Sequence, residues 1–172
     1  MAKIVLTGGP SSGKTSLIEE LSSMGHSVIP EVAKDLILKI GNLDPRDKVS
    51  YAKFQEDVAL EQIRREEELY KGQITFLDRG LYDGIAYSQK YLGFVPEALS
   101  ASARKHSGYE RIFVLDRLPF VKENFRIENG EAEAAELHHR IVKVYSNYYK
   151  NLERVPVLPI KDRLNYVLEK LK

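Results

Sequence analysis

The amino-acid sequence predicts an α/β protein with five parallel strands in one sheet and helices on both faces. Short apolar runs of strand length alternate with longer segments whose apolar residues recur at helical spacing. This alternation continues along the whole chain, without a repeat, a linker or a low-complexity segment. Strands that alternate with helices pair in parallel through right-handed crossovers, which places helices on both faces of the sheet.

The five expected strands are short runs rich in Val, Ile, Leu and Phe, bounded by turn residues or charges. They cover residues 3–7, 26–30, 74–78, 111–116 and 155–160. Parallel sheets of this class bind ligands beyond the carboxyl ends of their strands. The residues that follow each strand are therefore the candidates for function.

The expected helices place apolar residues three and four positions apart. The C-terminal helix shows this most clearly, and its apolar face carries Leu164, Val167, Leu168 and Leu171. The other expected helices cover residues 16–24, 31–40, 45–70, 82–91, 96–106 and 131–151. Residues 117–130 are polar and irregular, so we expect a loop there.

Composition narrows the possible classes of function. The 172 residues are 43% hydrophobic and 30% charged with a net charge of +1, which fits one domain over residues 1–172. This balanced charge argues against nucleic-acid binding through a basic surface. The chain contains no cysteine, which excludes disulfides, thiol nucleophiles and cysteine metal sites.

The start of the chain and its hydropathy favour a cytoplasmic protein. The first expected strand starts at about Lys3, which leaves no room for a cleaved signal peptide. No apolar stretch approaches the length of a membrane span, so we expect no membrane partner. The sequence does not indicate an oligomeric state, because exposed helix faces do not show which of them pairs.

The segment GGPSSGKT fits the pattern G-x-x-x-x-G-K-[ST] of a phosphate-binding P-loop, and it lies between an expected strand and an expected helix. Two glycines let the backbone turn so that N–H groups face an anion, and the helix dipole adds to the attraction. Lys14 would reach the β- and γ-phosphates, and the Thr15 hydroxyl would ligate Mg²⁺. We therefore expect a nucleoside triphosphate with magnesium. The expected binding residues are Gly8, Gly9, Pro10, Ser11, Ser12, Gly13, Lys14, Thr15 and Ser16.

Asp78 and Arg79 follow the third expected strand. Asp78 would hold Mg²⁺, directly or through water, although an aspartate here would also cap the next helix. Motor ATPases usually have a glutamate beside this aspartate, and it activates water; here the neighbour is Arg79. An arginine in this position suits a charged acceptor or a transferring phosphoryl group.

Glu31 comes just after the second expected strand, near the γ-phosphate end of the site. A carboxylate there would accept the proton of a substrate hydroxyl as a general base. An acid in the first turn of a helix is also favoured by the helix dipole alone, and the sequence supports both interpretations equally. Asp35, one turn later, is a weaker candidate.

The irregular segment 117–130 contains Arg117, Lys122 and Arg126. Arginines on a lid over phosphates stabilise transition-state charge and exclude water, and we favour Arg126 slightly over Arg117 as the catalytic one. A solvated loop would have a similar composition.

The sequence leaves the roles of several other polar residues open. The long helix carries Tyr51, Gln55, Val58 and Gln62 on one face, which would bind a flat ring, although we favour a half-buried helix with hydrated glutamines. Asp83 would either orient the acceptor or cap a helix. We expect structural roles for the histidines, since the adjacent pair at positions 138 and 139 points to different faces.

Four longer stretches carry a family resemblance: GGPSSGKTSL, PEVAKDLI, FLDRGLYDGIAY and VPVLPIKDRLNYVLEKL. The chain resembles the P-loop nucleoside and nucleotide kinase superfamily over essentially its whole length. It is most similar to a family of small predicted AAA-type ATPases or kinases grouped with the ribosylnicotinamide kinase domain of NadR-type proteins.

The resemblance implies a three-layer P-loop NTPase fold with sheet order 2-3-1-4-5, ATP as donor and a short lid at about residues 117–130. It also implies that Asp78 and Arg79 serve magnesium and the acceptor, and that residues 157–160 flank the donor base. The chain departs from the characterised kinases where its third strand ends in Asp-Arg-Gly. It also lacks an acceptor-base fingerprint, so the resemblance names no substrate.

The favoured function is transfer of the γ-phosphoryl group of ATP to a small nucleoside, nucleotide or riboside-like acceptor, with Lys14, Glu31, Arg79 and Arg126 as the catalytic residues. The alternative is a P-loop ATPase or GTPase with a regulatory or partner-coupled role. The Asn-Lys-x-Asp guanine reader and the Asp-x-x-Gly switch of signalling GTPases are absent from the sequence.

Overall fold

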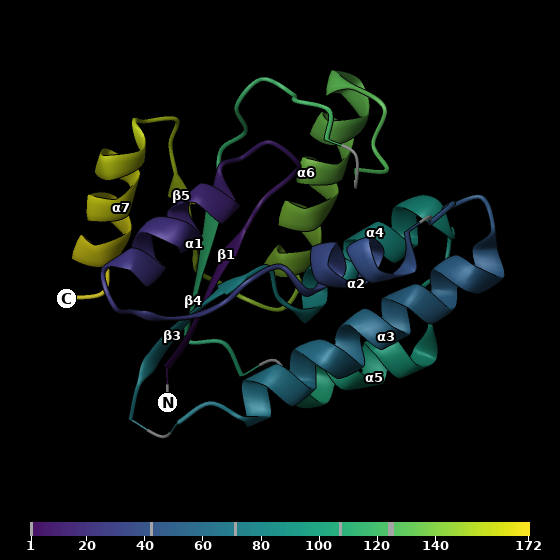
Figure 1. Cartoon of the computed structure of the whole chain (residues 1–172), viewed down its shortest axis with the longest axis horizontal. Helices are drawn as coiled ribbons and strands as arrows, with labels where there is room; N and C mark the ends of the chain where they lie inside the picture. Colours follow the sequence, from purple (N-terminus) through teal and green to yellow (C-terminus); the bar gives the residue numbers. More distant parts are fainter. Residues whose placement is uncertain (1, 42, 71, 107, 124–125) are drawn as a thin grey trace.

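Five parallel strands form one sheet in the order β2-β3-β1-β4-β5 in the computed structural model, which describes residues 2–41, 43–70, 72–106, 108–123 and 126–172. This is the order that the resemblance implies, and helices cover both faces (Figure 1). The strands are β1 (Ala2–Thr7), β2 (Ser27–Ile29), β3 (Ile74–Asp78), β4 (Arg111–Leu115) and β5 (Leu152–Val155). The expected fold class is confirmed.

The helices fall into three groups. Helices α1 and α7 cover one face of the sheet, and α4 and α6 cover the other (Figure 1). Helices α3 and α5 lie against α4 at the side, and α2 lies against α3. The helices are α1 (Lys14–Ser23), α2 (Val32–Ile40), α3 (Lys48–Glu67), α4 (Leu81–Tyr91), α5 (Glu97–His106), α6 (Glu131–Ser146) and α7 (Ile160–Glu169). None of these described helices has the length and apolar character needed to span a membrane.

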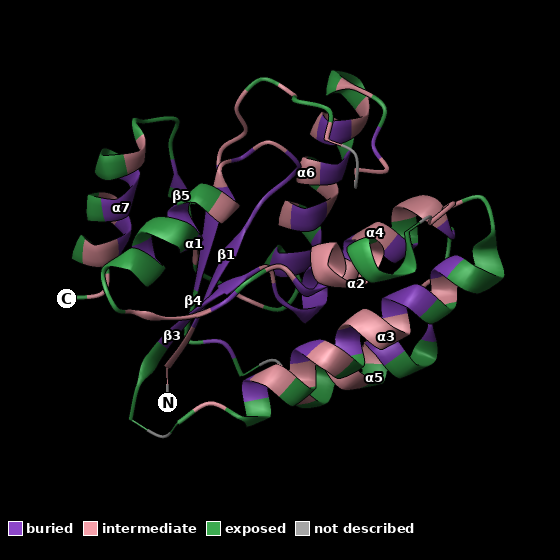
Figure 2. Ribbon diagram, viewed as in Figure 1, coloured by how far each residue is buried: buried purple, intermediate pink, exposed green. Residues whose placement is uncertain are grey.

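Alternating residues of the strands form two separate cores, because successive side chains of a strand point to opposite faces. In β1, Ile4 and Leu6 pack with α1 and α7, whereas Val5 packs with the helices on the opposite face. Strand β4 repeats this pattern. The three central strands β1, β3 and β4 are therefore buried on both faces, as Figure 2 shows, and they form continuous apolar runs in the sequence.

The expected position of the fifth strand, residues 155–160, is wrong. Strand β5 covers Leu152–Val155 and pairs with Ile112–Leu115, and α7 already begins at Ile160. Pro156 and Pro159 have no N–H to donate to a strand ladder. The observed strand lies at the edge of the sheet, where Glu153 and Arg154 remain accessible to solvent, so an apolar pattern does not mark it.

Several helix ends differ from the expected ones by a few residues. Helix α1 begins at Lys14, directly after Gly13, whose φ of 78° is left-handed. The long helix α3 begins three residues later than expected, where the side chain of Asp47 accepts a hydrogen bond from the Ser50 N–H at 3.2 Å. Helix α6 ends at Ser146 instead of residue 151.

A buried ionic cluster joins the start of β1 to the end of α3. The ammonium of Lys3 pairs with the Glu66 carboxylate at 2.6 Å, and their side chains are 11% and 4% exposed. Glu66 also accepts hydrogen bonds from the Gln62 amide at 2.8 Å and from the Tyr109 hydroxyl at 3.2 Å. Removing this carboxylate would leave the Lys3 charge buried without its ion-pair partner.

We therefore expect the Glu66→Ala variant to lose about 3–5 kcal/mol in its free energy of unfolding, measured by urea denaturation. Its neighbour Glu67 has a side chain that is 66% exposed, so Glu67→Ala is the matched control and should cost less than about 1 kcal/mol. Equal losses in the two variants would contradict a structural role for the cluster.

Candidate nucleotide-binding and transfer site

The P-loop connects β1 to α1 and lies against the end of β4. Gly8 has a φ of 136°, and a Cβ atom there would come within 2.6 Å of the Leu115 carbonyl oxygen, so only glycine fits. The Lys14 ammonium turns back into the loop and donates hydrogen bonds to the carbonyl oxygens of Gly8 and Gly9 at 2.9 and 3.0 Å, and to the Ser12 hydroxyl at 3.1 Å. Burial, with a further contribution from the nearby Arg79, lowers the pKa of Lys14 to about 8.

Asp78 lies at the end of β3, beside the start of α1. Its Oδ2 atom accepts a hydrogen bond from the Thr15 hydroxyl at 3.0 Å. Its Oδ1 atom is buried and has no hydrogen-bond partner among the described residues. Burial raises the pKa of Asp78 to about 6, and the negative charge of Glu31 adds to this rise. A buried carboxylate with one unused oxygen next to a threonine hydroxyl is a donor set that fits Mg²⁺.

Arg79 has an unusual backbone and a central position. Its φ of 75° is left-handed, which is rare and unfavourable for a bulky residue. This turn directs the guanidinium between two carboxylates, Glu31 at 2.9 Å and Asp83 at 3.3 Å. Its Cζ atom also lies 5.3 Å from the centre of the Tyr87 ring. The strained backbone at Arg79 therefore goes together with the position of its guanidinium between Glu31 and Asp83.

Glu31 precedes the first residue of α2, but its side chain makes no capping hydrogen bond to that helix. It points instead toward Arg79 and lines the same cavity. Burial alone would raise the pKa of Glu31, but the positive charges of Arg79 and Lys14 outweigh it and hold the pKa below its ordinary value. Glu31 is therefore ionised at neutral pH, and the geometry favours the interaction with Arg79 over helix capping. Asp35 instead pairs with Arg65 of α3 at 2.9 Å.

Asp83 in α4 is fully engaged in structural contacts. It accepts hydrogen bonds from the Thr7 hydroxyl at 2.8 Å, the Gly80 N–H at 3.0 Å and the Tyr145 hydroxyl at 2.7 Å. Of the two roles left open by the sequence, the geometry supports capping of the helix. Asp83 also positions Arg79 through their ion pair.

The packing around Gly80 explains why glycine follows Asp78 and Arg79 at the end of the third strand. Its φ of −133° is ordinary, so conformation does not require glycine. A Cβ atom at this position would lie 2.8 Å from the Tyr145 hydroxyl and 2.9 Å from the Tyr109 ring. The two tyrosines therefore occupy the space in which other residue types would place a side chain.

Three side chains distant in the sequence hold the outer surface of the P-loop. The Nδ1 atom of His138 accepts a hydrogen bond from the Gly9 N–H at 3.1 Å. The buried Arg163 donates to the Ser12 carbonyl oxygen at 2.6 Å, and Arg117 donates to the Pro10 carbonyl oxygen at 3.2 Å. Sequence reasoning missed Arg163 and gave His138 no role at the site, because no local pattern marks a side chain that supports a loop from outside.

The segment 117–130 lies over the P-loop, although its residues 124 and 125 are outside the described part of the chain. Its first half is bound to the loop, since the N–H groups of Leu118 and Val121 donate to Ser11 at 2.8 and 3.0 Å. Arg117 pairs with Glu131 at 2.6 Å and does not line the cavity. Arg126 does line it and pairs with Glu123 at 2.8 Å. The structure thus brings Arg126 into the cavity with Glu31 and Arg79, whereas Arg117 contacts the P-loop at Pro10 and does not enter the cavity.

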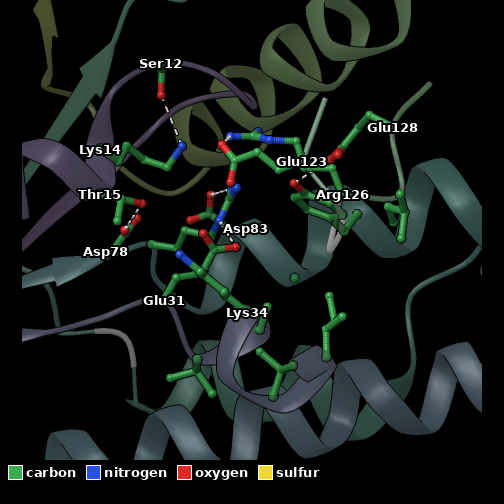
Figure 3. Close-up of a pocket in the computed structure, with 18 of the residues that line it drawn as sticks. Ser12, Lys14, Thr15, Glu31, Lys34, Asp78, Asp83, Glu123, Arg126 and Glu128 are labelled. Carbon is green, nitrogen blue, oxygen red and sulfur yellow. Dashed lines mark hydrogen bonds and ion pairs between the residues drawn. The ribbon is translucent and has the colours of Figure 1, made fainter. Parts of the chain in front are cut away.

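One cavity of about 450 Å³ joins the P-loop to the side group of helices. Figure 3 shows the P-loop residues and Asp78 on one side of it, Glu31 and Lys34 of α2 below, and Glu123, Arg126 and Glu128 of segment 117–130 on the other side. Its far end is lined by residues of α2, α3, α4 and α5, including the apolar Val58 and Leu99. The P-loop and the pocket between the helices thus share one space.

The face of α3 that the sequence singled out forms part of this far end. Tyr51, Phe54, Gln55, Val58 and Gln62 all line the cavity, and both glutamines are 4% exposed, so they are not the hydrated side chains that we favoured from the sequence. Because the Glu66 carboxylate can only accept hydrogen bonds, Gln62 must turn its NH₂ group toward it.

A comparison with models of protein families identifies the family of this chain. A family model described as "AAA domain" matches residues 3–163, which is nearly the whole chain. The chain belongs to the AAA domain family. A comparison with curated proteins found no match.

Solved structures similar to this AAA domain protein share its fold. A deoxyadenosine kinase from M. mycoides with bound dCMP and dCDP has a TM-score of 0.64 and 15% identity, over 98% of this chain and 97% of that chain. A NadR protein in complex with NR has a TM-score of 0.67 and 18% identity, over 98% of this chain and 51% of that chain. A NadR protein in complex with NAD and AMP-PNP has a TM-score of 0.68 and 17% identity, over 99% and 48%. The chain thus spans about half the length of the NadR proteins.

The contact between His138 and Gly9 makes the fold sensitive to acid. Burial lowers the pKa of His138 from 6.5 to about 4. Between these pH values the unfolded chain takes up a proton that the folded protein excludes, so stability falls as the pH falls from 6.5 to 4. We expect the wild type to lose on the order of 1–2 kcal/mol more than His138→Gln over this window, allowing for screening at a partly exposed ring. His26 precedes β2 and makes its ring contact with Phe76, so His26→Gln leaves the surroundings of His138 unaltered and should follow the wild type in denaturant titrations. Identical pH profiles for all three proteins would contradict the assignment.

Proposed function

We propose that this AAA domain protein is a magnesium-dependent phosphotransferase that moves the γ-phosphoryl group of ATP to a small nucleoside, nucleotide or riboside-like acceptor. The observation that carries this proposal is the Glu31–Arg79 pair, which lies beside Asp78 in a cavity shared by the P-loop and a separate pocket. The kinase-like fold of the neighbours supports the same function.

The P-loop forms the donor half of the proposed site. The backbone N–H groups of residues 11–16 and the Lys14 ammonium would bind the phosphates of ATP. Thr15 and Asp78 would hold the magnesium ion, which neutralises charge on the β- and γ-phosphates when it is bound. The supports from His138, Arg117 and Arg163 fix the loop from outside, so that its inner surface remains available to the nucleotide.

The acceptor half is formed by the end of β3, by α2 to α5 and by segment 117–130. Glu31 accepts the proton of the attacking hydroxyl as that oxygen approaches the γ-phosphorus. Arg79 and Arg126 stabilise the negative charge of the transferring group. Residues of the segment cover the phosphates and limit the access of water.

The pocket argues for transfer over simple hydrolysis. A P-loop ATPase or GTPase coupled to a protein partner activates water and needs no enclosed space for a second small molecule. Here Arg79 takes the position in which a water-activating glutamate would be expected, and Val58, Ala59 and Leu99 line a pocket beyond it. These features support a small acceptor.

The first test is release of ADP from ATP against a panel of nucleosides, nucleoside monophosphates and nicotinamide riboside. We expect at least one compound to stimulate release, and Lys14→Ala to lower the stimulated rate by about 100-fold or more, because an electrostatic donor to the transferring phosphates is lost. Hydrolysis at the same rate with and without every compound would favour the ATPase alternative.

The second test concerns the proposed base. We expect Glu31→Gln to lower kcat by about 10²–10⁴-fold, while the affinity for ATP measured by calorimetry stays nearly unchanged, since the proton acceptor is lost but the P-loop is not altered. The matched control is Asp35→Asn, one turn along the same helix and paired with Arg65 away from the reaction centre. An unaltered kcat in Glu31→Gln would remove Glu31 from the mechanism.

A further inference from the structure

The charged side chains of the acceptor half support an inference about the class of acceptor. This inference rests on the proposed function. We propose that the acceptor is an alcohol without a phosphate group, a nucleoside or riboside, and that nucleoside monophosphates are rejected as acceptors. The arginines that line the cavity are already paired with carboxylates, and one of these carboxylates, Glu31, is the proposed base for a hydroxyl.

The arginines that could bind an acceptor phosphate are already paired with acids, and the two acids that hold Arg79 are largely buried while Glu123, which holds Arg126, is 41% exposed. Arg79 is 12% exposed and lies between Glu31 and Asp83, whose side chains are 14% and 4% exposed. Arg126 is 15% exposed and pairs with Glu123. Lys34 also lines the cavity, and it too has an interaction partner. A phosphate dianion would have to displace carboxylates from these cations and leave the carboxylates nearby, which is unfavourable in a site with little water.

A further buried acid faces the same space. Glu128 in segment 117–130 lines the cavity, is 2% exposed and accepts a hydrogen bond from the Tyr87 hydroxyl at 2.9 Å. The ring of Tyr87 in turn lies against the Arg79 guanidinium. Figure 3 shows that Glu31, Asp83, Glu123 and Glu128 surround the space beside the P-loop. The described residues that line the cavity include six carboxylates and four cations, so the lining offers no net positive charge for a second phosphate dianion next to the triphosphate. An uncharged alcohol needs no such charge.

The proposed step also needs a base only if the acceptor is an alcohol. The hydroxyl oxygen forms a bond to the γ-phosphorus, the bond from that phosphorus to the bridging oxygen of ADP breaks with its electron pair, and the hydroxyl proton passes to Glu31. An acceptor phosphate is already deprotonated at neutral pH and has no proton to give. The placement of Glu31 beside Arg79 therefore matches an alcohol, because a phosphate acceptor needs no base.

The test compares each nucleoside, and nicotinamide riboside, with its own 5′-monophosphate as acceptor, and mass spectrometry identifies the product. We expect monophosphate to form from at least one unphosphorylated compound, with a kcat/KM at least about tenfold above that for conversion of its monophosphate to a diphosphate. Diphosphate formation at an equal or higher rate would overturn this inference and leave the proposed phosphotransfer intact. If no compound of either kind is phosphorylated, the proposed function itself is contradicted, and this inference with it.

A variant tests whether the charge pairing sets the preference. Glu123→Gln removes the partner acid of Arg126, so we expect the ratio of kcat/KM for the alcohol to kcat/KM for its monophosphate to fall several-fold. The matched control is Glu136→Gln, because Glu136 is half exposed and pairs with Lys90 and Arg140 outside the cavity; its ratio should equal that of the wild type. Equal ratios in both variants and the wild type would show that this pairing does not exclude the phosphate.

Discussion

The ion pair between Arg79 and Glu31 is the contact on which the rest of the site depends. It joins the ends of β2 and β3, which are neighbours in the sheet, and it places a charged group beside the P-loop. The left-handed backbone at Arg79 makes this direction possible, and the surrounding structure must stabilise that strained conformation. Asp83 supplies the support, because it binds Arg79 and also reaches β1 and α6 through Thr7 and Tyr145.

Burial determines both the arrangement and the pKa values of these charged groups. In a buried site a charged group is stable only beside its partner, so each acid and base is held in one arrangement. The same burial raises the pKa of Asp78 to about 6, while the cations keep the pKa of Glu31 below its ordinary value. Two nearby carboxylates thus differ in pKa, because burial prevails at Asp78 and the neighbouring cations together outweigh burial at Glu31.

Much of the fold and part of the site could be predicted from the sequence, since they depend on local patterns. The P-loop, its flanking strand and helix, and the position of Asp78 and Arg79 at a strand end all follow from neighbouring residues. Strand β5 could not be placed, because an edge strand tolerates Glu153 and Arg154 and the adjacent prolines lie in an apolar run. The glycine after Arg79 was read as an unexplained departure, and packing against Tyr145 and Tyr109 accounts for it.

By itself, the sequence determined which residues stand at the ends of the strands: the P-loop after the first, Glu31 after the second, and Asp78 with Arg79 at the third. Only the tertiary structure decided which side chains meet there. Gly9 and His138 are 129 positions apart and Ser12 and Arg163 are 151 apart, so no sequence pattern connects them. The fold likewise decided that Arg126 faces the cavity while Arg117 supports the loop, because two arginines in one polar segment have the same local chemistry and differ only in what surrounds them.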